Sequence, residues 1–373
     1  MIRIEKDDHG RNLTAYVDAC IALSDPYGLE ITCRSELFQR SLIAQLLPHA
    51  HRWETLDLGG PWHDVFSLPA ASPSCPRLKK VVLADFCEDL MDITRVLDFT
   101  RGSIGQVEHL KVETCSVTRV EGDMDIPPFT SLRSLEISMG DGVCSCPSRF
   151  LRTVLLSKLT IESLVADCCP IDGPWSELDA VEPIYMPALY DLNLSITSHV
   201  FMRRIIAPAL ESLYLDAPTS ARGLPDGDFC TSLYALVSAS DAPHSLLSLR
   251  TVDIPEDFDD VAALAFTRTL ERLGNLETLW VQGADDANQV MSQTTIDALT
   301  CREGFPPPVP YLNWLVMSPG YNKFPPEAAI EHVALLQNVL LSRATPRVIE
   351  GTAVSMLRCV MVPELQYDQR IYE

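Results

Sequence analysis

The sequence predicts an α/β solenoid, in which short parallel strands stack into a sheet and helices or loops return the chain along the other side. Three observations favour this class. A short apolar phrase recurs along most of the chain, its copies are evenly spaced at first, and several intervals between copies have helical periodicity. A chain of 373 residues is also longer than one compact core usually serves, whereas a repeat lets the core grow along an axis.

The recurring phrase has an apolar residue, two free positions, an apolar residue, one free position and a third apolar residue. Its eleven copies are WETLDL from Trp53, LKKVVL from Leu78, VEHLKV from Val107, LRSLEI from Leu132, LSKLTI from Leu156, LYDLNL from Leu189, LESLYL from Leu210, LRTVDI from Leu249, LETLWV from Leu276, LNWLVM from Leu312 and LRCVMV from Leu357. A twelfth, degenerate copy is expected at Leu29, Ile31 and Cys33. Each copy fits a strand, because alternate side chains of a strand point to opposite faces.

The spacing of the second apolar residue points to leucine-rich repeats, which have about 20 to 29 residues per turn. The first four steps, from Leu56 to Leu159, cover 24 to 29 residues, and later steps reach 45. Regular repeats place Asn or Cys three residues after the last apolar position, and here only Cys115 fits. We therefore expect a horseshoe of about 11 to 12 irregular repeats, with the parallel sheet on the concave face and helices and loops on the convex face.

The chain is expected to divide into a cap and a solenoid. Residues 1–50 form an N-terminal cap with the degenerate first repeat and a helix, and residues 51–373 form the solenoid. Longer insertions follow residue 215, and a capping repeat ends the chain. Helical spacing of apolar residues predicts helices over 36–47, 257–274 and 326–341.

The charge balance excludes some partner classes. Against 29 Lys and Arg stand 51 Asp and Glu, and the formal charge of -22 repels phosphate backbones and anionic lipid. The N-terminus does not read as a secretory signal, and no apolar run has the length of a membrane span. We expect a cytoplasmic or nuclear protein with reduced thiols, which binds neither nucleic acid nor membranes.

Catalytic and metal-binding motifs are missing from the sequence. It has no phosphate-cradling glycine loop and no serine-hydrolase elbow. Cysteines that lie close together lack a second cluster at zinc-site spacing, and His49 and His51 lack further ligands nearby. We therefore expect no enzyme activity, no cofactor and no metal.

One stretch carries a family resemblance. LLPHAHRWETLDL, from Leu46 to Leu58, resembles the start of the repeat region in fungal F-box-like proteins with irregular leucine-rich repeats, where a helix ending in LLPH and then H-R-W lead into the first strand. The segment from Tyr16 to Cys33 resembles what those proteins place just upstream. The resemblance implies substrate recognition in a ubiquitin-ligase context. Only about 15 residues precede the first recognisable helix, so we expect this chain to lack the F-box. It would contact a Skp adaptor only if an F-box exists upstream.

Two groups of residues are candidates for binding a partner on the concave face. The first has large apolar side chains at positions between the apolar ones of later repeats: Tyr214, Trp280, Trp314, Val316 and Met361. Aromatic anchors of this kind are typical of binding hot spots, although burial under the insertions after Leu215 and Leu279 would also explain them. The second is a basic group that could attract an acidic segment or form an ordinary solvated face: Lys80, His109, Lys111 and Lys158.

These features together predict a non-enzymatic protein-interaction scaffold. Its role in substrate recognition is implied by the resemblance to F-box-like proteins. The alternative is a leucine-rich-repeat regulator of another enzyme, such as a small GTPase. Both functions need a protein partner on the concave face of the sheet.

Overall fold

The structure of the protein, a computed structural model, has two compact units, Met1–Ala188 and Leu189–Glu373. It describes residues 1–4, 13–34, 44–59, 75–84, 97, 100–114, 126–143, 147–169, 182–216, 228–240, 245–252, 260–282, 292–318 and 336–361. Each unit combines a parallel sheet with helices, so the predicted α/β class with parallel strands is confirmed.

In the first unit, the strands lie in the sheet in the order in which they occur in the chain. They are β1 (Ile2–Ile4), β2 (Leu29–Cys33), β3 (Trp53–Gly59), β4 (Lys80–Ala84), β5 (His109–Thr114), β6 (Ser134–Val143) and β7 (Ser163–Cys169). Every neighbouring pair is parallel, so each connection crosses back along the sheet. The other elements of this unit are α1 (Leu13–Leu23), the 3₁₀-helices η1 (Leu47–Arg52) and η2 (Thr100–Ser103), α4 (Pro147–Ser157) and β8 (Ile184–Tyr185).

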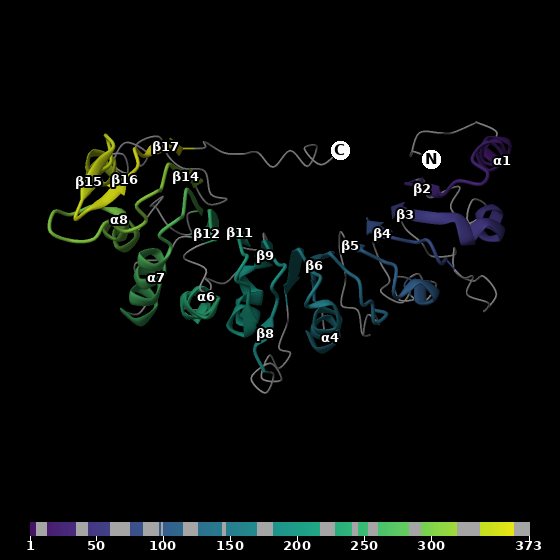
Figure 1. The fold of residues 1–373 in the computed structure, drawn as a ribbon, viewed down its shortest axis with the longest axis horizontal. Coiled ribbons are helices and arrows are strands. Elements are labelled where there is room, and N and C mark those ends of the chain that lie inside the picture. Colours follow the sequence, from purple (N-terminus) through teal and green to yellow (C-terminus); the bar gives the residue numbers. More distant parts are fainter. Residues whose placement is uncertain are drawn as a thin grey trace. The chain divides into compact units, whose positions relative to one another are not determined.

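The second unit has the same kind of sheet. Its parallel strands, in sheet order, are β9 (Asp191–Ser195), β11 (Ser212–Asp216), β12 (Ser248–Val252), β13 (Thr278–Gln282), β14 (Trp314–Ser318) and β17 (Arg358–Met361). The remaining elements are η3 (Ile196–Arg204), β10 (Ile205–Ile206), α6 (Asp228–Ala239), α7 (Asp260–Arg272), α8 (Gln293–Leu299), β15 (Arg347–Ile349) and β16 (Thr352–Val354). Helices α6 and α7 pack on each other and lie on one side of β11, β12 and β13 (Figure 1).

Buried apolar residues stack in register from strand to strand and form the core of each unit. In the first unit the stacked column is Ile31, Leu56, Val81, Leu110, Leu135 and Leu164. In the second unit it is Leu192, Leu213, Leu249, Leu279 and Leu315. All of these side chains are at most 1% exposed. At about 25 cal/mol per Å² of apolar surface, such columns are the main stabilising term of each sheet.

The entry into each strand is built from the same backbone contacts. In the first unit the carbonyls of Lys79, Glu108 and Arg133 each accept two N–H groups from the next turn of the chain, at 2.7 to 3.0 Å. Equivalent positions hold Glu54 and Glu162, so the sign of the charge alternates along this row. Arg133 and Glu162 form an exposed ion pair at 3.6 Å. The backbone hydrogen bonds of this row fix how far the chain advances along the sheet with each turn.

Turns that contain proline precede several strands. The N–H of Leu78 donates to the Cys75 carbonyl at 3.1 Å, and the N–H of Leu210 donates to the Ala207 carbonyl at 3.2 Å. In both turns proline follows the acceptor residue, where its fixed φ suits a β-turn. The turn delivers a leucine that is 0% exposed into the core just before the strand.

Three copies of the predicted phrase lie in a different register. LSKLTI is wrong as a strand, because Leu156 belongs to α4 and Leu159 is 62% exposed in the turn that follows. The strand there is β7, whose Leu164 pairs with Leu135. In LRTVDI the marker is Leu249 instead of Val252, and in LRCVMV it is Cys359 instead of Val360, as their strand partners Leu213 and Leu315 require.

The predicted helices are confirmed where the structure describes them. The helix predicted over 257–274 is α7, which buries Phe266 and Leu270 but leaves Val261 and Leu264 exposed, because Ala262 and Thr269 share its inner face. The helix predicted over 326–341 is helical from residue 336, and most of the one over 36–47 lies outside the described residues.

Several elements were not predicted, among them the helices α4, α6 and α8. Another is β1, a three-residue strand too short to contain the full phrase. The antiparallel hairpin of β15 and β16 was not predicted either. Its two central residues, Glu350 and Gly351, have φ of 47° and 79°, which is typical of the type I′ turn that joins twisted strands tightly.

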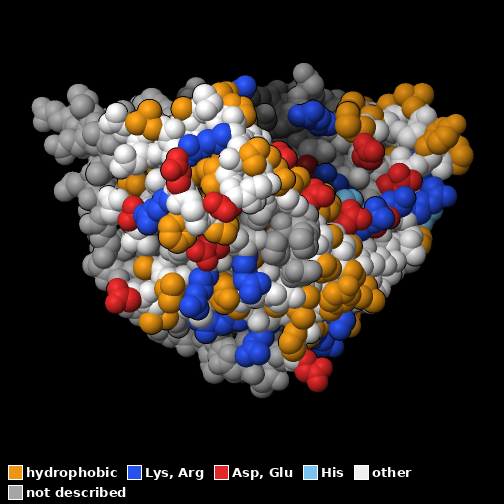
Figure 2. Space-filling view, turned by 60° about the vertical axis from the view of Figure 1, so that its left-hand side comes forward, with side chains coloured by type: hydrophobic (Ala, Val, Ile, Leu, Met, Phe, Trp, Pro, Cys, Tyr) orange, Lys and Arg blue, Asp and Glu red, His pale blue; other side chains and the backbone are white. Residues whose placement is uncertain are grey.

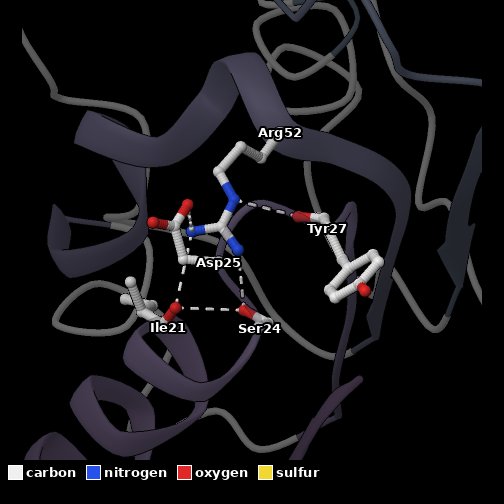
Figure 3. A network of polar contacts seen from close by, with 5 residues as sticks. All are labelled: Ile21, Ser24, Asp25, Tyr27 and Arg52. Carbon is white, nitrogen blue, oxygen red and sulfur yellow. Dashed lines mark hydrogen bonds and ion pairs between the residues drawn. The ribbon is translucent and has the colours of Figure 1, made fainter.

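Arg52 fastens the end of η1 to the loop after α1 (Figure 3). The side chain is buried, and its guanidinium donates from Nε to the Tyr27 carbonyl at 3.0 Å. It also donates to Ser24 Oγ at 2.8 Å and to the Ile21 carbonyl at 3.4 Å. Asp25 lies 3.8 Å away as an ion-pair partner, but its side chain is 74% exposed. The carbonyls and the hydroxyl therefore hold Arg52 more firmly than the carboxylate does.

Replacing Arg52 with Ala is expected to destabilise the first unit by about 2 to 3 kcal/mol, because the buried acceptors of the guanidinium lose their donors. Asp25→Asn is the matched control and should change the free energy of unfolding by less than about 1 kcal/mol, since its ion pair is exposed. Urea unfolding followed by circular dichroism measures both. Equal losses in the two variants would show that the ion pair, and not the carbonyl contacts, carries the stabilisation.

Candidate functional site

Alternate strand residues lie on the face of each sheet opposite to the buried column. In the first unit Lys80 and His109 are Cα neighbours on β4 and β5, and both side chains are exposed. Lys111 lies two residues further along β5, between Val82 on β4 and Glu136 on β6. The structure therefore brings together three of the four predicted basic residues. We call Lys80, Val82, His109, Lys111 and Glu136 the first-unit face.

Carboxylates neutralise the centre of the first-unit face. Lys111 Nζ lies 2.7 Å from Glu136 Oε1 and 3.1 Å from Glu113 Oε2. Burial lowers the pKa of Lys111, but the hydrogen bonds and charges of Glu136 and Glu113 outweigh burial and raise this pKa above its usual value. Nearby, Arg34 pairs with Asp57 at 3.5 Å. An incoming acidic segment would have to compete with these internal partners, which weakens the predicted attraction.

Lys158 does not belong to the first-unit face. It lies in the turn between α4 and β7, outside the sheet. The prediction was wrong because it placed the strand at LSKLTI instead of at Ser163–Cys169. At the position where Lys158 was expected, the residue that pairs with Ser134 is Ser163.

In the second unit, the structure gathers most of the predicted apolar residues and adds two arginines to them. Tyr214, Arg250, Trp280 and Val316 are successive Cα partners on β11, β12, β13 and β14. Trp314 lies two residues before Val316 and pairs with Arg358 on β17. We call Arg250, Trp280, Trp314, Val316 and Arg358 the Trp–Arg face.

Each tryptophan of this face is stacked with an arginine from a neighbouring strand. The Cζ atom of Arg250 lies 4.8 Å from the ring centroid of Trp280, and that of Arg358 lies 5.3 Å from the ring centroid of Trp314. Cation–π contacts of this length are worth about 0.5 to 2 kcal/mol, depending on exposure. In each pair the guanidinium group comes from the strand next to that of the tryptophan.

The exposed fractions of these side chains show in part whether the aromatic residues are covered. Trp314 is 40% exposed, so burial does not explain it. Tyr214, Trp280 and Val316 are half-buried. The insertions at 217–227 and 283–291, which were the other explanation, lie outside the described residues.

The register of β17 differs from the one predicted for Met361. Met361 is the Cα partner of Met317, which is 0% exposed, whereas Val360 is the Cα partner of Val316. The error is a slip of one residue in reading LRCVMV, and a one-residue slip moves a side chain to the opposite face of a strand.

Arg250 and Arg358 are the functional candidates that the sequence reading missed. Both were missed because the marker of their strand was taken too late in the sequence, at Val252 and Val360. Arg250 was therefore expected before the strand of LRTVDI, and Arg358 before that of LRCVMV. A usable signal was present, because LLSLRT, from Leu246 to Thr251, also matches the phrase if a buried threonine is allowed at its end.

The Trp–Arg face has no acidic strand residue beside it on β12, β13, β14 or β17. By register, the positions on its side of these strands are Ser248, Arg250, Val252, Thr278, Trp280, Gln282, Trp314, Val316, Ser318, Arg358 and Val360. The charged residues among these positions are Arg250 and Arg358.

A buried serine–histidine pair in the second unit is structural. His199 Nδ1 lies 2.9 Å from Ser232 Oγ, and Arg203 Nε donates to the same oxygen at 2.7 Å. Ser232 is 0% exposed and His199 is 5% exposed, so no substrate reaches the hydroxyl. The group joins η3 to α6. No set of three or more potential metal ligands lies together within the described residues.

Comparison with models of protein families gave no match, and no curated protein matches the chain. Within the described part of the chain, none of the helices is long and apolar enough to cross a membrane. Figure 2 shows acidic and basic side chains interspersed with hydrophobic ones on the side in view. The arrangement on the Trp–Arg face is thus the most specific feature from which a function can be argued.

Proposed function

We propose that this protein is a non-enzymatic protein-interaction scaffold of the leucine-rich-repeat type, in which the Trp–Arg face holds the partner. The observation that carries the proposal is the pair of arginine-stacked tryptophans on one side of the second unit's sheet. Trp and Arg are the residue types most enriched among binding hot spots. A sheet side that combines aromatic anchors with hydrogen-bond donors offers both apolar contact area and directional contacts.

The repeat fold and the F-box-like relationship belong to the same proposal. The in-register stacking of buried residues within each unit, with strands in chain order, supports turns of a solenoid that form a horseshoe. The stretch from Leu46 to Leu58 supports a relationship to F-box-like proteins, and hence a role in recognising ligase substrates in the cytoplasm or nucleus.

The test of partner binding is a Trp280→Ala/Trp314→Ala double variant. Proteins that co-purify with the parent chain from its source cells should be recovered at least tenfold less with the variant, because losing one hot-spot residue costs about 2 kcal/mol or more of binding free energy. Quantitative mass spectrometry measures the recovery, and circular dichroism verifies that the variant is folded. Unchanged recovery with a folded variant would rule out this face.

The matched control replaces two other exposed aromatic residues of the second unit. Tyr190 and Phe305 are 45% and 65% exposed and lie outside its strands, so Tyr190→Ala/Phe305→Ala should leave recovery unchanged. A Skp adaptor and a cullin among the recovered proteins would support the ligase context. If partners were lost with the tryptophans but neither ligase component were recovered, the scaffold would stand without that context.

A further inference from the structure

We propose that one edge of the second unit's sheet, separate from the Trp–Arg face, docks a basic amphipathic helix of a partner protein. Three exposed residues carry the inference, and we call Glu211, Leu247 and Glu277 the acidic row. The inference goes beyond the proposed function, because it adds a second surface with its own kind of ligand.

The backbone places the residues of the acidic row at the same point of successive turns. The Glu211 carbonyl accepts the N–H groups of Leu247 and Ser248 at 2.9 and 3.0 Å. The Leu247 carbonyl accepts those of Glu277 and Thr278 at the same distances. Each residue of the row immediately precedes a strand, and β11, β12 and β13 pair in parallel register from the next residue onward. The three side chains therefore leave the backbone at equivalent points, about 4.8 Å apart from one strand to the next.

The matching row of the first unit differs from the acidic row in its charges. Acid and base alternate along it: Glu54, Lys79, Glu108, Arg133 and Glu162. In the acidic row, Leu247 takes the place between the two glutamates, and its side chain is 39% exposed. The next residues at either end of the row, Tyr190 and Asn313, are uncharged. Where the first unit places a counter-charge, the second unit therefore presents apolar surface.

The strand residues beside the acidic row have short side chains. Ser212, Ser248 and Thr278 directly follow the residues of the row and are half-buried. Since no long side chain stands at these three positions, a partner helix that lies along the row can reach Leu247 with its own apolar residues. The surface thus offers one apolar contact with a carboxylate on either side of it.

The spacing along the acidic row favours a helix over an extended peptide. Glu211 and Glu277 are two strand spacings apart, about 9.6 Å. In an α-helix, residues i and i+7 lie on one face about 10.5 Å apart, with residue i+3 or i+4 between them on that face. Three residues of an extended chain span about 10 Å, but residues i and i+3 then point to opposite sides. A helix with Lys at i and i+7 and Leu between them therefore matches both glutamates and Leu247 together.

The charge of the whole protein favours the same ligand. The formal charge of -22 attracts a basic segment at long range, and the acidic row then determines where the segment binds. Long-range attraction alone does not distinguish one basic sequence from another. The order of Lys and Leu in a probe peptide therefore separates binding at the acidic row from diffuse attraction.

The test uses the full chain and four fluorescein-labelled peptides of about 18 residues, long enough to form a helix, read by fluorescence anisotropy. The first peptide has Leu and Lys in alternate helical turns on one face, with Ala and Gln elsewhere. The second has the same residues in shuffled order, the third has Gln in place of Lys, and the fourth has Ser in place of Leu. We expect the first peptide to bind about tenfold or more tightly than each of the others, and its affinity to fall as salt is raised.

Protein variants then locate the binding. Glu211→Gln/Glu277→Gln should weaken binding of the first peptide about tenfold or more, and Leu247→Ser should remove the preference for Leu over Ser in the peptide. The matched control, Glu108→Gln/Glu162→Gln, removes the same charge from the row of the first unit and should leave the affinity unchanged. Circular dichroism verifies the fold of each variant.

Equal affinity for the first and the shuffled peptide would overturn the inference, because diffuse attraction would then explain the binding. Binding that survives Glu211→Gln/Glu277→Gln, or that falls equally with the first-unit control, would overturn it too. So would the absence of binding by every peptide.

The inference and the proposed function can fail separately. Cellular partners test the Trp–Arg face, whereas the peptides test the acidic row. Trp280→Ala/Trp314→Ala should therefore leave the affinity of the first peptide unchanged. A loss equal to that of the glutamate double variant would overturn the claim that the acidic row is a separate surface.

Discussion

A Leu164→Asp substitution is expected to unfold the first unit, whereas Leu159→Asp should leave it folded. Leu164 is 0% exposed and pairs with Leu135 in the core column, so an aspartate there would place an unpaired carboxylate among leucines. The loss should exceed about 4 kcal/mol, because burial of an unpaired charge and the removal of a buried leucine both contribute. Leu159, 62% exposed in the turn after α4, should lose less than about 1 kcal/mol.

Thermal unfolding followed by circular dichroism measures both variants, which differ from the parent by the same chemical change five residues apart. The comparison tests the register of β7 directly. If Leu159→Asp unfolded the protein and Leu164→Asp did not, the strand would be LSKLTI and Lys158 would return to the first-unit face.

Replacing Arg343 with Met should destabilise the second unit by about 3 kcal/mol or more. This arginine is 0% exposed and donates to the carbonyls of Leu299 and Val309 at 3.1 Å each, and also to the carbonyl of Pro308. Burial lowers the pKa of Arg343, and the carbonyls compensate the guanidinium for the water it has lost. Methionine keeps an unbranched apolar chain but leaves these carbonyls without donors, at about 1 to 3 kcal/mol for each buried one.

The same contacts hold a strained residue. Val309 has φ of 38°, which a β-branched residue rarely adopts, and the bond from Arg343 to its carbonyl helps to keep it there. Arg302→Met is the matched control in this unit. Its ion pair with Asp297, at 3.4 Å, is more than half exposed and should be worth less than about 1 kcal/mol. Urea unfolding of the two variants should differ clearly, and equal midpoints would contradict a structural role for Arg343.

The phrase in the sequence predicted the strands well, but could not by itself choose between overlapping copies. LSKLTI and IESLVA share Ile161, and both match the pattern. The choice is made by α4, which ends at Ser157, since the Ser157 carbonyl accepts the N–H groups of Thr160 and Ile161 and so keeps this stretch in a turn. The spacing between marker residues is also consistent with IESLVA. With Leu164 as the marker, the step from Leu135 is 29 residues, like the step from Val81 to Leu110.

The candidate site was predicted in part for the same reason. The aromatic residues of β13 and β14 were found because LETLWV and LNWLVM are unambiguous copies. Arg250 and Arg358 were missed because their strands end the phrase differently: Thr251 fills a buried position that the pattern reserves for an apolar residue, and Cys359 is the marker of β17. An odd-numbered slip inverts the two faces of a strand, so each arginine was excluded from the face it occupies.

The alternation of charge along the row from Glu54 to Glu162 bears on how such a chain can change in evolution. Loss of one turn, for example residues 109–133, would bring Glu108 next to Glu162 and place two like charges one strand apart. Loss of two consecutive turns would keep opposite signs adjacent. Deletions and duplications in the first unit should therefore be tolerated more readily in pairs than singly.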